Sequence, residues 1–515
     1  MRHIIVSIVN VFVFLKVEFI EIMKFYIFVL LLFTGMFIIG QITVPIPNIN
    51  KVKAELVKLS EHPDLKNASI GFFAIDMEDN TVIAEYNADM SLVPASVMKV
   101  FTTAAALEIL GSNFKFKTSI HYTGEIDTLT GELNGNVFIL GGGDPCLGST
   151  VFKKNYYEPF FMETWKDSIK SLGIRKINGY LVADASFYKD NNIPSTWIWG
   201  DIANYYGAVP SALSIYENTY KLKFNSGANQ GDSTYITAIE PDHVELNIDN
   251  HVISSNSSGD NAYIYGCPND NFRYIEGTIP KNRTEFIVKG SIPDPPLLVA
   301  GDFFKVLSED SITVTNGIIE INNSDFYDTL PRTMICTTFS PSLSSIIYWT
   351  NLRSHNLFAE HIMYYIGYVK YNTAGNISGT NAITDFWKEK GIDTDGLYVN
   401  DGSGLSRYNG VTARQLTNIM KYMNNGKNKE VFKKSLPEAG VSGTLSGICK
   451  GTVAENRIFA KSGTMTRVKS YTGYATTLQD RNIAFAVIVN NFNCSPGEIN
   501  KKLEKILVSI VEYSK

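Results

Sequence analysis

The segment Val93-Pro94-Ala95-Ser96-Val97-Met98-Lys99-Val100-Phe101 holds the feature on which the interpretation of the whole chain depends. It leads into an alanine-rich apolar run that ends at Gly111. Pro94 before the run and Gly111 after it are the usual boundaries of a helix. Residues three apart share one helix face, so Ser96 and Lys99 can touch. A serine hydroxyl needs a base to become a nucleophile, and a partly desolvated lysine with a lowered pKa can be that base.

The Ser-x-x-Lys pattern by itself is a weak signal. Four-residue matches are frequent, and an N-cap serine followed by an exposed lysine is the commoner explanation of an isolated match. Two later segments, Ser354-His355-Asn356 and Lys461-Ser462-Gly463, favour the catalytic interpretation of Ser96 and Lys99 over the helix-cap interpretation. Each alone is typical of a helix cap or a turn. In this order, the three form the motif set of serine penicillin-binding proteins and β-lactamases.

The first two motifs have complementary chemical roles. Ser96 would be the nucleophile and Lys99 its base. Ser354 can relay a proton between Lys99 and the leaving group. Asn356 offers an amide that can hold the backbone of a substrate. These residues predict a serine hydrolase that works through a covalent intermediate.

The third motif provides groups for recognition. Lys461 would place positive charge opposite a substrate carboxylate, and the hydroxyls of Ser462 and Thr464 can bind the same carboxylate. On an edge strand, Gly463 would let the substrate approach the backbone closely. A backbone N–H there, together with that of Ser96, would form an oxyanion hole. Other serine chemistry is poorly supported, because the chain has neither a G-x-S-x-G elbow nor a P-loop.

The spacing of the motifs resembles one family in particular. Ser354 follows Ser96 by 258 residues, and Lys461 follows Ser354 by 107. The large gap is similar to that of the class C low-molecular-mass penicillin-binding proteins, the D-alanyl-D-alanine carboxypeptidase/endopeptidase family. The resemblance covers about residues 50–510. Further matching segments are Gly141-Gly142-Gly143-Asp144-Pro145, Tyr205-Tyr206-Gly207-Ala208, Ser211-Ala212-Leu213-Ser214, Asp401-Gly402-Ser403-Gly404-Leu405-Ser406-Arg407 and Lys461-Ser462-Gly463-Thr464.

The resemblance implies an α/β (α+β) fold. A transpeptidase/β-lactamase-like domain, with an antiparallel sheet flanked by helices, would comprise residues 42–115 and 335–515. Residues 116–334 would be an insertion of one or two small domains. Many short strand-like runs between residues 212 and 330 indicate that this insertion is β-rich.

The resemblance also assigns residues to the substrate's side chain. Asp144 and Arg407 would reach the ammonium and carboxylate of a diamino acid, with Met465 nearby. Two positions depart from the family pattern. Ser462 replaces the commoner threonine but keeps the hydroxyl, and Lys469 stands where a small or apolar residue is usual.

Local patterns predict individual elements. Residues 68–75 and 81–86 are strand-like around a hairpin signal, and residues 176–184 are expected to form one strand. Residues 412–424 are expected to form a helix with Thr412 as its N-cap. An apolar stripe from Ile499 to Val511 predicts a C-terminal amphipathic helix.

Composition and the N-terminus restrict the partners. The 515 residues imply more than one domain, and a net charge of −5 without a basic tract gives no reason to expect nucleic acid. The five scattered cysteines form no zinc motif, and no metal or other cofactor is expected. Residues 1–41 are predicted to be a signal peptide or an N-terminal anchor. This predicts export to the periplasm or to the outer face of the cytoplasmic membrane, and it allows membrane association through the N-terminus.

The expected function is therefore a serine D-Ala-D-Ala carboxypeptidase acting on peptidoglycan stem peptides through an acyl-enzyme and inhibited by β-lactams. The same machinery could act as a DD-endopeptidase. Two alternatives remain open at this point: a β-lactamase or esterase using the same site, and a catalytically inactive cell-wall-binding protein.

Overall fold

The computed structural model describes residues 50–152, 160–189, 193–321 and 330–515. Residues 51–515 form one compact unit. The predicted signal peptide or anchor, residues 1–41, lies outside the described residues. Within the described ranges, no helix combines the length and apolarity that a membrane span requires.

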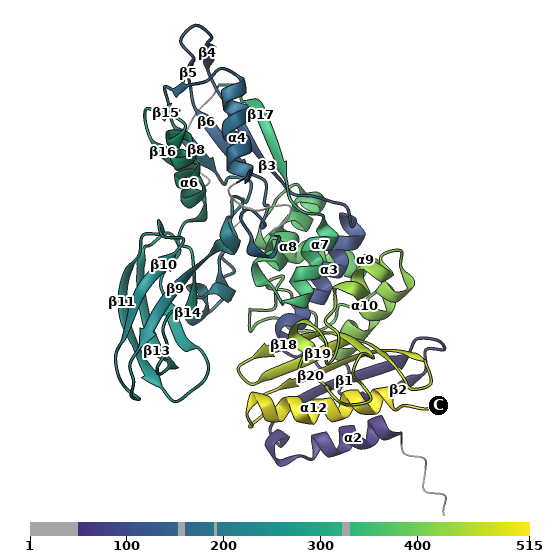
Figure 1. Ribbon diagram of the computed structural model, residues 1–515. Coiled ribbons are helices and arrows are strands. Elements are labelled where there is room, and N and C mark those ends of the chain that lie inside the picture. The colour runs from purple at the N-terminus through teal and green to yellow at the C-terminus, as the bar shows by residue number, and fades with distance from the viewer. Residues whose placement is uncertain (1–49, 153–159, 190–192, 322–329) are drawn as a thin grey trace, which may run out of the picture. The chain divides into compact units, whose positions relative to one another are not determined.

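A five-stranded antiparallel sheet combines strands from both ends of the described chain (Figure 1). Its strands, in spatial order, are β18 (Ile458–Met465), β19 (Val468–Thr476), β20 (Asn482–Asn490), β1 (Ser69–Asp76) and β2 (Val82–Tyr86). The predicted hairpin at residues 68–86 is confirmed, with Asn80 in the left-handed conformation at its turn. β18 is an edge strand, as expected for the segment that carries Lys461 and Gly463.

Both faces of this sheet are buried. Along β20, Ile483, Phe485 and Val487 join one apolar core, while Ala484 and Ala486 join the other. This alternation follows from the two-residue period of a strand. Helices α2 (Lys51–Ser60) and α12 (Pro496–Val511) cover the first face, and α10 (Ala413–Asn425) packs on the second. The predicted C-terminal helix is thereby confirmed.

Helix α3 (Lys99–Ile109) lies among other helices on the α10 side of the sheet (Figure 1). Its first nine residues are all buried, which accounts for a composition that is apolar nearly all round. The surrounding helices are α7 (Leu343–Leu352), α8 (Asn356–Tyr371), α9 (Asn376–Glu389) and α11 (Lys429–Ser435). This packing places the start of α3 beside the start of α8.

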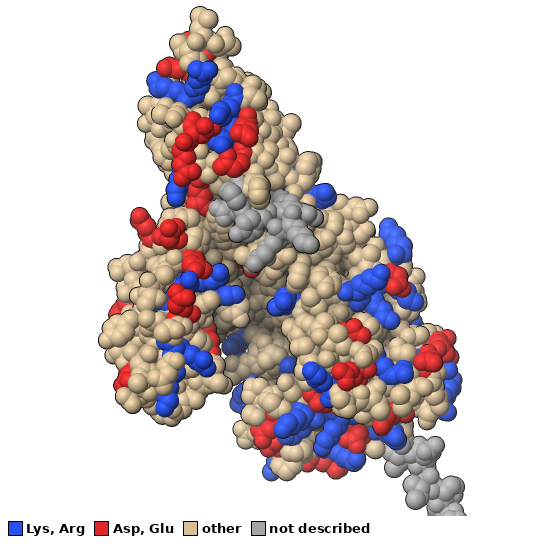
Figure 2. All heavy atoms as spheres, viewed as in Figure 1, with Lys and Arg blue, Asp and Glu red and all other residues tan. Residues whose placement is uncertain are grey.

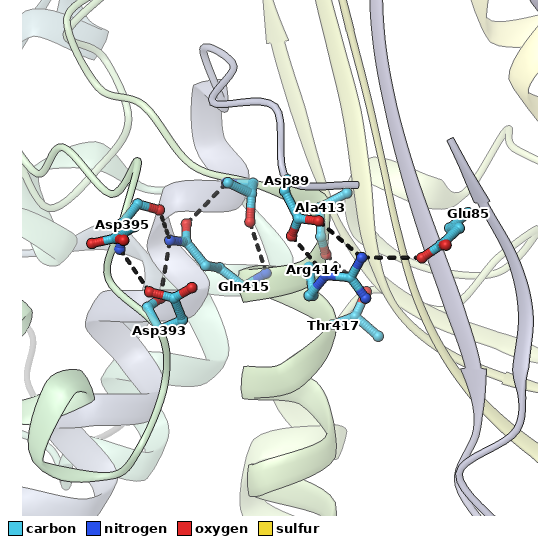
Figure 3. Close-up of polar contacts among 9 residues, drawn as sticks. Glu85, Asp89, Asp393, Asp395, Ala413, Arg414, Gln415 and Thr417 are labelled. Atoms are coloured by element: carbon cyan, nitrogen blue, oxygen red, sulfur yellow. Dashed lines mark hydrogen bonds and ion pairs between the residues drawn. The ribbon is translucent and has the colours of Figure 1, made fainter. Parts of the chain in front are cut away.

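The start of α10 is held by side chains, as Figure 3 shows. Thr412 is its N-cap, as predicted, and exchanges side-chain and backbone hydrogen bonds with Gln415. The Gln415 amide also donates to the carbonyls of Asp393 and Asp395, at 3.0 and 2.8 Å. Arg414 binds the Asp89 carboxylate through two nitrogens, at 2.6 and 2.9 Å. These contacts fasten the helix to the loop before it and to the segment after β2.

The insertion begins with a mixed sheet that is joined to the helical cluster by a shared core. This sheet contains β16 (Ile318–Ile321), β8 (Leu181–Asp184), β6 (Val137–Gly141), β3 (Lys117–Tyr122) and β17 (Thr333–Phe339). A four-stranded sheet contains β15 (Thr313–Val314), β7 (Lys176–Ile177), β5 (Glu132–Asn134) and β4 (Glu125–Asp127). Helices α4 (Phe160–Ser171) and α6 (Pro295–Glu309) accompany them.

Residues 219–291 of the insertion build a body with an apolar core of its own. One three-stranded sheet contains β10 (Thr234–Glu240), β9 (Thr219–Ser226) and β14 (Phe286–Ser291). The other contains β11 (Asn247–Ser255), β13 (Phe272–Pro280) and β12 (Asn261–Tyr265). The insertion is therefore β-rich, as predicted.

One local prediction is wrong. Residues 176–184 form two strands, β7 and β8, in different sheets. At the break, a Cβ on Gly179 would lie 2.1 Å from the carbonyl oxygen of Gly135, and Asn178 hydrogen-bonds to Glu132 and Asn134 instead of continuing a strand. The close backbone approach at the glycine explains the interruption.

Candidate active site

The predicted nucleophile and its base are in contact. Ser96 lies in a short 3-10 turn, Ala95–Met98, directly before α3. The Nζ of Lys99 is 3.1 Å from the Oγ of Ser96. Ala95 has a φ of +50°, a conformation that costs a non-glycine residue free energy and is frequent at functional sites. The expected contact between Ser96 and Lys99 is therefore present, whereas the strained residue before Ser96 was not anticipated from the sequence.

The surroundings of Lys99 favour its neutral form. The side chain is completely buried, and burial lowers its pKa to about 7, although Asp401 and Glu360 act in the opposite direction. Its Nζ also donates to the Oδ1 of Asn356 and to the carbonyl of Ser403, both at 2.6 Å. A lysine held this way near neutral pH can accept the proton of Ser96.

Loop 401–407 is itself held by buried carboxylates that sequence reasoning did not single out. Both oxygens of Glu360 accept backbone N–H groups, those of Gly402 and Ser403, at 3.0 and 2.7 Å. Asp401 accepts the N–H of Gly404 at 2.8 Å and the indole N–H of Trp197 at 2.8 Å. These contacts position the Ser403 carbonyl that binds Lys99.

Ser354 and Lys461 form the second reactive pair. Lys461 donates to the Oγ of Ser354 at 2.9 Å and to the carbonyl of Ser462 at 2.7 Å. Ser354 has a φ of +58°, again in the left-handed region. Burial lowers the pKa of Lys461 well below its usual value, and the charges of Lys99 and Lys469 lower it further. A bound carboxylate would favour the charged form of Lys461.

Asn356 joins the two domains at this point. It is the first residue of α8, and its Nδ2 donates to the carbonyl of Tyr206, which belongs to the insertion, at 2.7 Å. Its Oδ1 accepts from Lys99. In this geometry Asn356 orients Lys99 in addition to the substrate-holding role that the sequence predicts for it.

The edge strand β18 packs tightly on the nucleophile turn. A Cβ on Gly463 would lie 2.6 Å from the carbonyl oxygen of Pro94 and 3.0 Å from the nitrogen of Ser96. Only glycine leaves room for this approach. The hydroxyl of Ser462 donates to that of Thr444 at 2.7 Å.

Lys469 has a partner in this strand. It lies opposite Thr464 in the β18–β19 ladder, and its Nζ is 2.9 Å from the Oγ1 of Thr464. Burial lowers the pKa of Lys469 to about 8. The departure from the family pattern therefore adds a third buried amine beside the predicted carboxylate site.

A cavity of about 620 Å³ connects these groups with the insertion. Ser96, Ser354, Asn356, Thr464 and Met465 line its catalytic side. Lining residues that the insertion contributes include Asp201, Tyr205, Tyr206, Glu217, Tyr263 and Lys289.

Of the two residues predicted to bind the diamino acid, the structure brings one to the cavity. Arg407 lines it, whereas Asp144 is 1% exposed, is not among the described lining residues and accepts the backbone N–H of Cys146 at 2.8 Å. The cavity instead contains Asp201. Burial raises the pKa of Asp201, although the positive charge of Arg407 lowers it in part. Asp201 was not singled out from the sequence, and the acidic end of the aromatic, glycine-containing segment 197–201 is the signal that could have found it.

Comparisons with known proteins identify relatives of this chain along most of its length. The chain is 25% identical over 447 residues to the D-alanyl-D-alanine carboxypeptidase DacB of Haemophilus influenzae, covering 85% of this chain and 88% of that protein. It is 26% identical over 481 residues to the D-alanyl-D-alanine carboxypeptidase of an Actinomadura species, covering 90% and 85%.

The fold has a solved counterpart. The crystal structure of penicillin-binding protein 4 from Haemophilus influenzae superposes with a TM-score of 0.73 at 23% identity, covering 89% of this chain and 98% of that one. The profile of the D-Ala-D-Ala carboxypeptidase 3 (S13) family matches residues 52–510. The chain therefore belongs to the D-Ala-D-Ala carboxypeptidase 3 (S13) family.

Proposed function

We propose that this chain is an exported serine carboxypeptidase that removes the terminal D-alanine from peptidoglycan stem peptides through an acyl-enzyme on Ser96. The observation that carries the proposal is the contact between Ser96 and a buried Lys99 of lowered pKa, inside a cavity that also presents Ser354 and Thr464. Membership of the family and the names of its relatives support the substrate class.

Acylation follows from the arrangement of these groups. Neutral Lys99 takes the proton of Ser96 as the Ser96 oxygen attacks the carbonyl carbon between the two D-alanines. The N–H of Ser96 and a backbone N–H of β18 stabilise the negative oxygen that develops. A proton passes through Ser354 to the departing nitrogen, the C–N bond breaks, and D-alanine leaves. Water then hydrolyses the ester and restores the free hydroxyl.

The substrate's terminal carboxylate would be bound by hydroxyls and by buried amines. Thr464 offers a hydroxyl on the cavity wall, with Lys461 and Lys469 behind it. A carboxylate placed there would accept hydrogen bonds and favour the protonated form of both amines. This requirement selects substrates and β-lactams that carry a carboxylate at that position.

Asp201 and Arg407 suit the other end of the substrate. A diamino-acid side chain ends in an ammonium and a carboxylate, which would pair with Asp201 and Arg407 respectively. The same contacts would serve a cross-linked peptide, so DD-endopeptidase activity uses the same residues. Asp144 is buried, and its proposed role is to stabilise its own loop.

The proposal is tested by labelling the purified protein with a fluorescent penicillin. Mass spectrometry should show the adduct on the peptide that contains Ser96, and Ser96→Ala should show none. Purified stem pentapeptide should lose one D-alanine. An adduct on another residue, or an unlabelled protein that folds correctly, would overturn the assignment.

The lifetime of the adduct separates the alternative functions. A carboxypeptidase should retain the penicilloyl group for many turnovers of peptide, whereas a β-lactamase should release it rapidly and destroy excess penicillin. An inactive wall-binding protein should do neither.

Export is proposed from the N-terminal pattern of residues 1–41. Fractionation of cells that express the full-length chain should recover it outside the cytoplasm. N-terminal sequencing of the recovered protein then distinguishes a cleaved signal peptide from a retained anchor.

A further inference from the structure

A second hollow adjoins the active-site cavity. It has a volume of about 1190 Å³ and shares lining residues with the cavity, among them Tyr205, Lys289 and Arg353. Figure 2 shows the surface hollowed between the β9–β14 body and the helical side, with lysine and arginine side chains at the margin. A ligand held at Ser96 can therefore extend into this hollow without leaving the protein surface.

Positive charge predominates in its lining. Lys115, Lys289 and Arg353 are exposed, and none of them has an ion pair with a described residue. Lys221 is paired with Glu240 at 3.1 Å. In a chain whose net charge is −5, an unpaired group of three cations creates a local field that attracts anions.

The acidic side chain of the hollow offsets only part of this charge. Glu217 is the one carboxylate among the described lining residues, and its own oxygens are occupied. One lies 3.2 Å from the Nε2 of His355, and the other accepts the hydroxyl of Ser149 at 2.7 Å.

Aromatic rings accompany the cations. The Arg353 guanidinium lies over the ring of Trp349 at 5.8 Å, and the Lys289 ammonium lies over that of Tyr205 at 6.0 Å. Aromatic faces provide apolar contact area beside the charges. This combination suits a ligand that carries both carboxylates and the flat apolar faces of sugar rings.

We infer that this second hollow binds the glycan-proximal part of the stem peptide. It is called the groove below and is defined by Lys115, Lys289, Arg353, Trp349 and Tyr205. The cations would pair with the free α-carboxylate of a γ-linked glutamate, and the rings would contact the sugar beyond it. The inference rests on the proposed function, since it takes the substrate to be a stem peptide whose other end reaches Ser96. It adds a recognition site for the portion of the substrate remote from the bond that is cut.

Three matched substrates test the groove. The first is a short acetylated peptide that consists of the diamino acid followed by D-Ala-D-Ala. The second extends it with the disaccharide, L-alanine and γ-linked D-glutamate. The third is identical to the second except that the glutamate α-carboxylate is an amide. Release of D-alanine is measured as kcat/KM for each.

Lys115 is the informative position, because it lines the groove but not the catalytic cavity. Lys115→Met should lower the preference for the glutamate substrate over the short peptide by about two- to fivefold, the size of one exposed ion pair. Lys115→Glu should lower it further, while Lys115→Arg should retain it. Lys281→Met, at an exposed position that lines neither hollow, is the control.

The outcomes are distinguishable. The inference predicts that turnover of the short peptide stays unchanged in the Lys115 variants and that the amidated substrate is insensitive to them. It is overturned if the glutamate and amide substrates respond equally, or if the Lys115 variants keep the wild-type preference. If the unaltered protein turns over none of the three substrates, it is the proposed function that fails.

Discussion

At the scale of single residues, this site depends on amines that are kept away from water. Lys99, Lys461 and Lys469 are buried, and burial lowers the pKa of each. A surface lysine with its ordinary pKa of about 10.4 would carry a proton at neutral pH and could not act as a base. In the proposed function, one residue type thus supplies both a base, Lys99, and two amines for a substrate carboxylate, Lys461 and Lys469.

The first prediction concerns Lys99. With a pKa of about 7, it loses its proton as the pH rises through 7. Penicillin acylation should therefore increase between pH 6 and 8, with a midpoint near 7, measured by stopped-flow fluorescence. Lys99→Arg should abolish acylation although the charge is kept, because arginine does not release its proton. Near-normal acylation by that variant would assign Lys99 a packing role.

The second prediction concerns Lys469. Lys469→Met should raise KM for D-Ala-D-Ala peptides more than it lowers kcat, because the amine acts on the carboxylate through Thr464. An acyl-D-alanine p-nitrophenyl ester, which has no carboxylate in its leaving group, should be turned over at nearly the original rate. Equal losses for both substrates would mean that Lys469 only supports the packing of β18 and β19.

The third prediction separates Asp201 from Asp144. Asp201→Ala and Arg407→Ala should each lower kcat/KM for diamino-acid peptides. The corresponding loss of transition-state stabilisation should be about 1.5–3 kcal/mol, the size of a hydrogen bond to a charged group. Simple penicillins, which lack that side chain, should still acylate Ser96. Asp144→Ala should instead lower the thermal midpoint without a change in peptide preference. A reversal of these two patterns would restore Asp144 as the recognition residue.

At the scale of elements, two of the predicted site residues lie at the starts of helices and a third lies on an edge strand. Ser96 precedes α3, Asn356 begins α8, and Lys461 lies on the edge strand β18. Such positions leave backbone N–H groups available, since the first turn of a helix has no internal partners for them. Helix α10 carries none of the predicted site residues, but it packs against both the sheet and α3.

The fourth prediction concerns the start of α10. Thr412→Ala removes the side-chain acceptor for the N–H of Gln415, which is 3.0 Å away, and should cost about 1 kcal/mol of unfolding free energy. Denaturant unfolding with circular dichroism measures the change. Thr412→Ser keeps the hydroxyl and serves as the control. A loss of the same size in the serine variant would show that the threonine methyl group, rather than the cap, matters.

At the scale of the whole molecule, the insertion completes the active site. Tyr206 binds Asn356, Asp201 lies in the cavity with Arg407, and Glu217 contacts His355, the residue between Ser354 and Asn356. The segment 354–356 is therefore held by Tyr206 and Glu217 as well as by Lys99 and Lys461.

The fifth prediction tests this connection. Glu217→Gln weakens the contact with His355 and should slow penicillin acylation by up to about tenfold, because the Ser354 loop loses an oriented partner. Glu276→Gln, an exposed change in the same insertion, is the control, and far-UV circular dichroism should be unchanged in both. Unaltered acylation would show that the insertion does not position the loop.

Local spacing was enough to predict the parts of this protein that depend on a few consecutive residues. Ser96 and Lys99 meet because they are three residues apart on one turn. Thr412 caps α10 because its side chain reaches the helix's own N–H groups. The hairpin at Asn80 and the apolar stripe of α12 follow from short-range periods in the same way. The family resemblance supplied the order of the three motifs across long gaps.

Tertiary structure alone decided which distant residues share the cavity. Asp144 and Asp201 both follow glycine in the sequence, yet packing buries the first against Cys146 and brings the second beside Arg407. The lowered pKa of Lys99 likewise requires its complete enclosure, and Lys469 needs the β18–β19 register to reach Thr464. Burial and long-range register arise from contacts among segments hundreds of residues apart, which no local pattern in one sequence contains.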